Sequence, residues 1–122
     1  MHTNANLNRV GIFIYWDGIC RFHLQSLIFG TPQNAIITVL HPAHAVAMLT
    51  PWETSGRTVH VCFIEGDLIE TLERCVMIGL VRHRINHFVL PFEDDRSRNL
   101  AATLTRMRYT VQFISQNQVG VA

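Results

Sequence analysis

The chain has 122 residues, enough for one domain with its own core and too few for two. Hydrophobic residues make up 48% and charged residues only 16%, against about 25% in an average soluble domain, so we expect a partner to cover some of the surface. The net charge of +1 gives no general attraction to nucleic acid or to a membrane surface. No apolar run approaches the roughly 18 residues of a membrane span, which argues against a membrane protein.

The first predicted element is a strand over residues 10–16, whose unbroken apolar run is typical of a strand buried on both faces of a parallel sheet. Asp17 follows this strand and is expected to cap a helix that ends by Gly30. The next predicted elements are a strand at residues 35–40, a short helix at 42–49 and a loop at 52–57.

The second half of the chain repeats the alternation of strand and helix. A strand at residues 58–64 precedes a helix with Leu68, Leu72, Cys75, Val76 and Gly79 on one face, and later come a strand at 86–90, a helix at 97–108 and a strand at 110–115. Five strands alternating with four helices predict a parallel sheet with right-handed crossovers, inside a three-layer α/β/α sandwich.

The cysteine pattern and the two chain ends complete the predicted organisation. Cys20, Cys62 and Cys75 form no C-x-x-C pair, so they predict neither a disulfide framework nor a thiolate zinc site, and they suit a reducing cytoplasm. The opening residues lack the charged and apolar parts of a signal peptide. We expect a flexible tail at residues 1–8, one domain at 9–116 and a second tail at 117–122.

Acidic residues follow three of the predicted strands, at the point where each strand ends. Asp17 follows the first strand, Asp67 the third, and Asp94 and Asp95 the fourth. Because the carboxyl ends of parallel strands meet at one edge of the sheet, we expect these side chains to share the edge where open α/β sheets bind ligands. Carboxylates that converge repel one another unless a cation lies between them, and oxygen ligands suit Mg²⁺ or Mn²⁺. Such an ion can activate water against a phosphodiester.

Each acid also has a purely structural explanation. Asp17 can be an N-cap, and Asp67 with Glu70 has the spacing of a capping box. The acidic turn at residues 93–95 can be a solvated loop before a helix. The sequence leaves both explanations open.

The segments that carry these acids resemble the NYN branch of the PIN-like ribonucleases. The first strand ends in Asp17-Gly18, where that family has F-I-D-G, and the fourth strand runs through Pro91-Phe92 into the acidic turn, where the family has S-G-D-S-D-F. The resemblance implies a sheet of order 3-2-1-4-5 with Asp17 and Asp94 on neighbouring strands. It also implies that these two carboxylates bind the metal ion that cleaves RNA, with Asp67 and Asp95 as lesser catalytic candidates.

All ten basic residues are arginines, and most lie in the second half of the chain. Arg96 and Arg98 flank the acidic turn at the start of a predicted helix, whose free amides also attract phosphate. Arg82 and Arg84 precede the fourth strand. We expect these four arginines to contact an RNA backbone; the alternative is an ordinary solvated helix face.

We therefore predict a Mg²⁺- or Mn²⁺-dependent endoribonuclease with Asp17 and Asp94 as metal ligands. The alternative is a non-catalytic α/β module with a decayed site, which binds RNA or another protein. No G-x-G-x-x-G follows the first strand, and Ser26, the serine near a histidine, lies inside a helix. Dinucleotide binding and a hydrolase triad are therefore not expected.

The predicted partner is a second copy of the chain. Large apolar residues with no obvious place in a single core are Trp16, Trp52, Phe29 and Met48. An interface burying about 1,600 Å² in total would cover a typical share of such side chains. A homodimer is therefore expected, with two sites forming one groove for a single strand.

Overall fold

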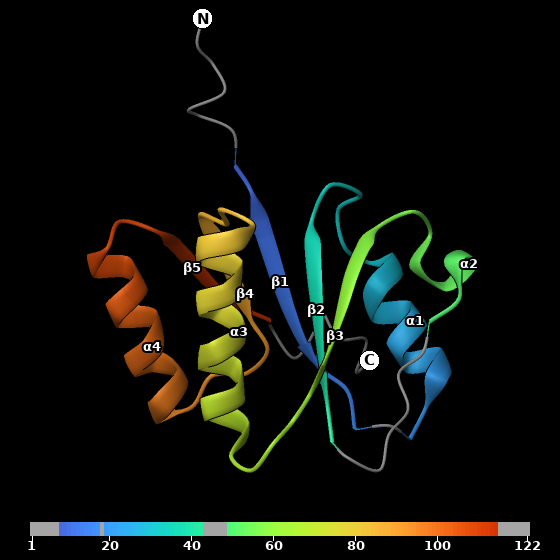
Figure 1. Ribbon diagram of the computed structural model, residues 1–122, viewed down its shortest axis with the longest axis horizontal. Coiled ribbons are helices and arrows are strands. Elements are labelled where there is room, and N and C mark those ends of the chain that lie inside the picture. The colour runs from blue at the N-terminus through green and yellow to red at the C-terminus, as the bar shows by residue number, and fades with distance from the viewer. Residues whose placement is uncertain (1–7, 18, 43–48, 115–122) are drawn as a thin grey trace, which may run out of the picture.

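The computed structural model describes residues 8–17, 19–42 and 49–114, and within them five strands form one parallel sheet. The strands are β1 (Val10–Tyr15), β2 (Ile36–His41), β3 (Thr58–Phe63), β4 (His87–Leu90) and β5 (Thr110–Phe113). Their order is β3-β2-β1-β4-β5, which places β1 at the centre between β2 and β4 (Figure 1). The predicted α/β fold and its strand order are confirmed.

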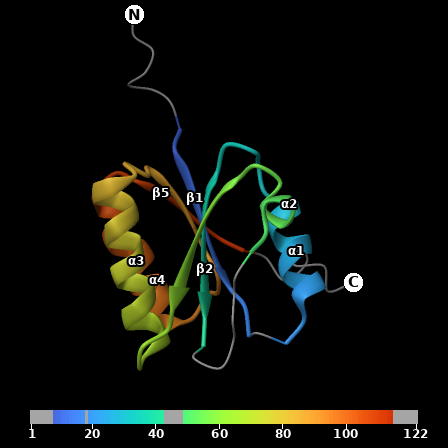
Figure 2. The same ribbon diagram turned by 45° about the vertical axis from the view of Figure 1, so that its right-hand side comes forward.

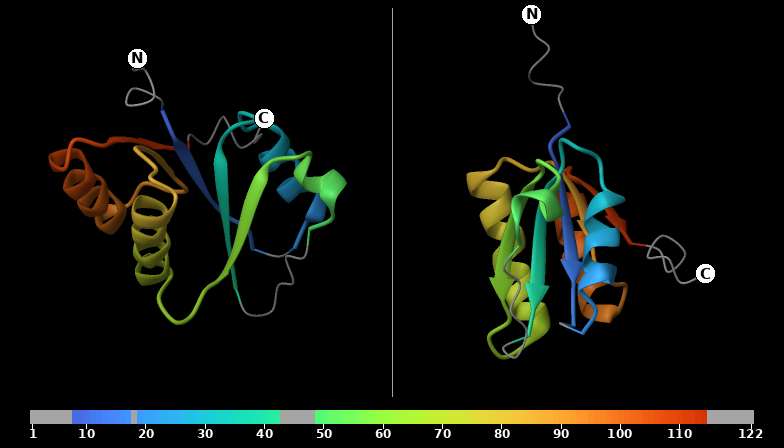
Figure 3. Two further views of the ribbon diagram at one scale, coloured as in Figure 1. Left: turned by 45° about the horizontal axis from the view of Figure 1, so that its top comes forward. Right: turned by 90° about the vertical axis from the view of Figure 1, so that its right-hand side faces the viewer.

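Helices lie on both faces of this sheet. They are α1 (Arg21–Phe29), α2 (Pro51–Thr54), α3 (Leu68–Arg82) and α4 (Asp95–Arg106). The first two lie on one face and the last two on the other (Figure 2), and the right-hand view of Figure 3 shows α1 and α3 on opposite sides of the strands. This follows from right-handed crossovers, because the chain adds strands in one direction up to β3 and in the other from β4 onward. None of the helices in the described ranges is both long and apolar enough to cross a membrane.

The core on the α3–α4 face is built around aromatic rings. Phe13 of β1 and Phe88 of β4 stack with ring centroids 6.3 Å apart, and the rings of Phe88 and Tyr109 form a T-shaped pair with centroids 5.8 Å apart. Leu72 from α3 and Leu104 from α4 close over them. Alternate residues of two neighbouring strands thus supply one apolar layer, as the period of a strand requires.

The core on the α1 face takes the other set of alternate residues. Ile12 and Ile14 of β1 pack with Leu24 and Ile28 of α1. Trp16 is also buried here, at 3% exposure, and its indole N–H donates to the carbonyl of Cys20 at 3.0 Å. The prediction that Trp16 lies on the surface is therefore wrong.

The other apolar residues expected at an interface have mixed outcomes. Trp52 is 65% exposed and Phe29 45% exposed, as expected for side chains outside a single core. Met48 lies outside the described residues, as does most of the helix predicted at residues 42–49.

Two local predictions are wrong, and both concern helix starts. Asp17 does not cap α1, which begins at Arg21 with Cys20 in the N-cap position. The reason is that the Trp16 indole binds the Cys20 carbonyl and Asp17 accepts the amide of Ile19, which together shape a turn before the helix.

The second error is the loop predicted at residues 52–57, whose first part is the short helix α2. The amide of Thr50 donates to the Glu53 carboxylate at 2.9 Å, which is the reciprocal half of a capping box. The sequence signal was Thr50-Pro51-Trp52-Glu53, with proline at the first helical position.

Candidate functional site

Asp17 and Asp94 follow neighbouring parallel strands at the point where the strand order reverses. β1 ends at Tyr15 and its neighbour β4 ends at Leu90, so Asp17 lies two residues beyond the carboxyl end of β1 and Asp94 four residues beyond that of β4. On its other side β1 pairs with β2, so the two acids lie at the switch point of the sheet. The fold therefore brings this predicted pair to one edge.

Asp17 lies in the short connection between β1 and α1. Its Oδ1 atom accepts the amide N–H of Ile19 at 2.9 Å, and the side chain is exposed. Within the described ranges Asp17 has no ion pair, and its second carboxylate oxygen has no hydrogen bond. Asp17 is thus oriented by the backbone and remains open to a ligand.

Asp94 is the N-cap of α4. Its Oδ1 atom accepts the amide N–H of Ser97 at 2.8 Å. That hydrogen bond holds the pKa of Asp94 below its usual value, and the nearby charges of Arg96 and Arg98 act in the same direction. The carboxylate is therefore ionised at neutral pH, and the capping geometry fixes its orientation.

Asp67 forms an ion pair with an arginine. Its Oδ2 atom lies 2.6 Å from Nη1 of Arg96, in a pair whose side chains are 37% and 53% exposed. This hydrogen bond is the main reason why the pKa of Asp67 is lowered. Asp95, 93% exposed, pairs in the same way with Arg98 at 2.5 Å. The two arginines predicted to hold phosphate therefore neutralise two of the predicted catalytic acids.

The donor set limits which metal ion the site can hold. Among the described residues no three His, Cys, Asp or Glu side chains are placed to bind a metal ion together. The predicted convergence of four acids is therefore not formed, because arginines take Asp67 and Asp95. Mg²⁺ is commonly bound through one or two carboxylates, with water and substrate phosphate completing its octahedron. Asp17 and Asp94 are carboxylates, the ligand type of such an ion.

The other two arginines predicted to contact RNA, Arg82 and Arg84, lie away from the acids. Arg82 ends α3, and Arg84 lies in the connection that precedes β4. They are near the amino end of β4, whereas Asp94 follows its carboxyl end, and a strand of four residues spans about 13 Å. Only Arg96 and Arg98 lie beside the acids.

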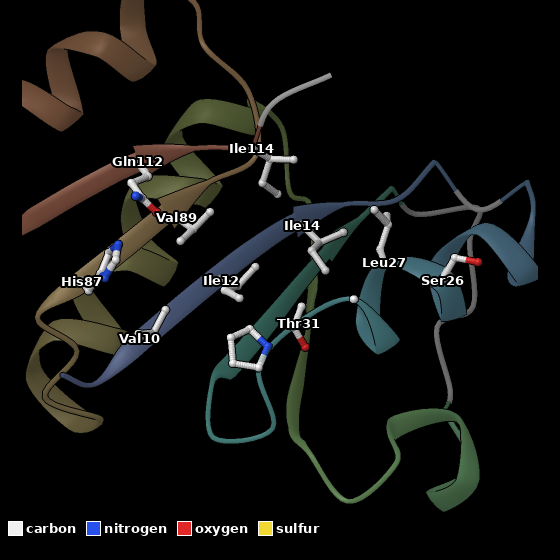
Figure 4. Close-up of a pocket in the computed structure, with 12 residues that line it drawn as sticks. Val10, Ile12, Ile14, Ser26, Leu27, Thr31, His87, Val89, Gln112 and Ile114 are labelled. Carbon is white, nitrogen blue, oxygen red and sulfur yellow. The ribbon is translucent and has the colours of Figure 1, made fainter. Parts of the chain in front are cut away.

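A cavity of about 430 Å³ opens on the α1 face of the sheet and was not predicted (Figure 4). Its floor is the face of β1, β4 and β5 that α1 does not cover, and it includes Ile12 and Val89. His87 and Gln112 add polar groups, and the buried Nε2 atom of His87 has no hydrogen-bond partner in the described part of the chain. A signal in the sequence was Val89, an apolar residue on the face of β4 opposite Phe88.

Comparisons of the chain with protein-family models, with curated proteins and with solved structures find no match. The fold and the acid pair define a general class, the parallel α/β proteins with an acidic switch point.

Proposed function

We propose that this protein is a PIN/NYN-like endoribonuclease of the cytoplasm that depends on Mg²⁺ or Mn²⁺. The observation that supports it is the pair of carboxyl side chains, Asp17 and Asp94, after neighbouring strands at the switch point. Each is held by a backbone amide and keeps one carboxylate oxygen outside that hydrogen bond.

Asp17 and Asp94 are the residues that would hold the ion. A bound Mg²⁺ or Mn²⁺ supplies charge stabilisation at the phosphodiester and lowers the pKa of a water molecule. The backbone hydrogen bonds from Ile19 and Ser97 orient both carboxylates before any ligand arrives. No rearrangement of the fold is then needed to present them.

Arg96 and Arg98 are the residues that would hold the RNA backbone. Both lie in the first turn of α4, where free amides add to their attraction for phosphate. Their ion pairs with Asp67 and Asp95 are exposed, and exposed pairs contribute about 1 kcal/mol or less. A phosphate can therefore replace a carboxylate at low cost.

The test is metal titration by calorimetry, with cleavage of a labelled single-stranded RNA measured in parallel. Asp17→Asn and Asp94→Asn keep the oxygen that accepts the backbone amide and remove the charge. We expect each to weaken metal binding by about tenfold or more and to slow cleavage by roughly 100-fold.

Glu73→Gln is the matched control, since Glu73 is an exposed carboxylate on α3 to which no role in the site is assigned. We expect it to change metal binding and cleavage by less than about twofold. Wild-type protein that neither binds the ion nor cuts RNA, or an Asp94→Asn variant with full activity, contradicts the proposal.

The second candidate is a non-catalytic module that binds RNA or another protein. The observation in its favour is that arginines already neutralise Asp67 and Asp95 without a metal ion. RNA affinity that is equal in EDTA and in Mg²⁺, and unchanged in Asp17→Asn, would select this candidate.

We also propose that two copies associate. Exposed Trp52 and Phe29, together with the open part of the α1 face, supply apolar surface for a partner. Sedimentation equilibrium should give a mass near twice the 13.9 kDa of one chain. A mass equal to one chain at every concentration contradicts the dimer.

A further inference from the structure

Cys62 and Cys75 are neighbours in the fold, although they are 13 positions apart in the chain. Cys62 lies on β3, the edge strand, and packs against the α3–α4 core, to which Cys75 of α3 belongs. The Sγ atoms are 2.9 Å apart, and the Cys75 thiol donates a hydrogen bond to the sulfur of Cys62. A disulfide requires about 2.05 Å between its sulfurs, so closing the bond takes a movement of less than about 1 Å.

The two thiols differ in their exposure to solvent. Cys62 is partly exposed at the edge of the sheet, whereas Cys75 is only 8% exposed. Burial, together with the hydrogen bond to Cys62, raises the pKa of the Cys75 thiol to about 12. Because the thiolate is the attacking species, Cys75 is a poor first nucleophile and Cys62 is the point of entry.

We propose that Cys62 and Cys75 form a reversible disulfide by exchange with a small disulfide such as oxidised glutathione. The Cys62 thiolate attacks one glutathione sulfur, breaks its S–S bond and releases one glutathione thiolate. Cys75 then loses its proton, attacks the Cys62 sulfur of the mixed disulfide and releases the second glutathione. The protein loses two hydrogens, and one oxidised glutathione becomes two reduced molecules.

The disulfide ties the edge strand of the sheet to the middle of α3. The loop it closes contains Asp67, which pairs with Arg96 at the start of α4. Oxidation therefore fixes the segment that carries this ion pair. The inference is independent of the ribonuclease proposal, because it rests on the two sulfurs alone. In a reducing compartment such a bond is transient, as sensing disulfides are.

The experiment treats the natively folded 122-residue chain with oxidised glutathione, alkylates the remaining thiols and maps the peptides by mass spectrometry. We expect a Cys62–Cys75 crosslink, with Cys20 carrying glutathione or the alkylating group, because Cys20 is exposed and precedes α1, on the face of the sheet opposite α3. Reduction with dithiothreitol should remove the crosslink. The oxidised protein should melt roughly 5–15 °C above the reduced protein.

Two variants test the order of attack. In Cys75→Ser the glutathione should remain on Cys62 as a stable mixed disulfide, whereas in Cys62→Ser the buried Cys75 should stay unmodified. A crosslink that forms only in denaturant, or native protein that accepts glutathione at Cys62 without releasing it, overturns the proposal. The measurement on the wild-type chain decides the question even if a variant fails to fold.

Discussion

The two faces of the sheet are packed to different degrees. On one face lie α3 and α4, with 15 and 12 residues, over a core of stacked aromatic rings. On the other face lie α1 and α2, with 9 and 4 residues, and the cavity opens over β1, β4 and β5. Parallel sheets are normally covered by helices on both faces. We therefore expect the α3–α4 face to contribute more to the stability of the sheet than the α1 face does.

The two faces also use different interactions. Ile85 fits between Gly11 of β1 and Gly79 of α3, so apolar groups are in direct contact with backbone on the α3–α4 face. On the α1 face, the carboxylate of Glu53 joins α2 to α1 by accepting hydrogen bonds from Arg21 and Gln25, both at 2.8 Å. The α3–α4 face is thus held by close apolar packing, whereas the α1 face depends partly on the buried carboxylate of Glu53.

The largest expected effect comes from the packed face. Phe88→Ala removes a ring with 0% exposure that contacts both Phe13 and Tyr109. We expect the free energy of unfolding to fall by about 3–5 kcal/mol, because the rigid surroundings cannot fill the space. Urea denaturation followed by circular dichroism measures this. A loss below about 1 kcal/mol would show that this face is not the main source of stability.

Gly11→Ala should have the next largest effect. A methyl group at this position collides with the side chain of Ile85, which is 2% exposed and has little room to move. We expect a loss of about 1–3 kcal/mol, as for other overpacked sites. Combining Gly11→Ala with Ile85→Val should recover part of this loss, and a double variant no more stable than Gly11→Ala would contradict the explanation.

Glu53→Gln tests the charged anchor of the other face. Its hydrogen bonds with Arg21, then Thr50 and Gln25, lower the pKa of Glu53, so the ionised form stabilises the fold. That stabilisation is complete above the ordinary pKa of 4.5 and is lost as the pH falls further. We expect the melting temperature at pH 7 to fall by roughly 3–8 °C in Glu53→Gln.

The pH dependence of the same variant gives a second readout. Between pH 5 and 3 the variant should lose less stability than the wild type does, which differential scanning calorimetry can measure. Glu73→Gln, a substitution at an exposed position of α3, is the control and should leave the melting temperature and its pH dependence unchanged. Equal acid sensitivity in Glu53→Gln and the wild type would contradict the role of the charge.

The smallest loss of stability is expected from substitutions of Val89, which follows Phe88 in β4. Val89 faces the cavity and is only partly buried. We expect Val89→Ala to cost about 1 kcal/mol or less, and Val89→Leu to be tolerated because the cavity can accept the extra carbon. If Val89→Ala were as damaging as Phe88→Ala, the difference between the two faces would not hold.

The confirmed strand order places Asp17 and Asp94 after neighbouring strands, and the roles predicted for these residues stay predictions. The sequence could place Asp17 and Asp94 at one edge of the sheet, because apolar runs located their strands and the alternation of strands and helices predicted a parallel sheet. The resemblance to the NYN branch supplied the strand order. Asp67 was expected to be a lesser catalytic candidate, and the structure pairs it with Arg96. Side-chain partners of this kind depend on how α3 and α4 start relative to each other, which no local pattern specifies.

The sequence by itself determined the strands, the long helices and the class of the fold, because hydrophobic periodicity is a local property of the chain. The tertiary structure decided which distant side chains meet. It joined Glu53 to Arg21, brought the sulfur of Cys62 to that of Cys75 and left part of the α1 face open. The physical reason is that such contacts depend on crossover paths and helix lengths, which are set only when the whole sheet is packed.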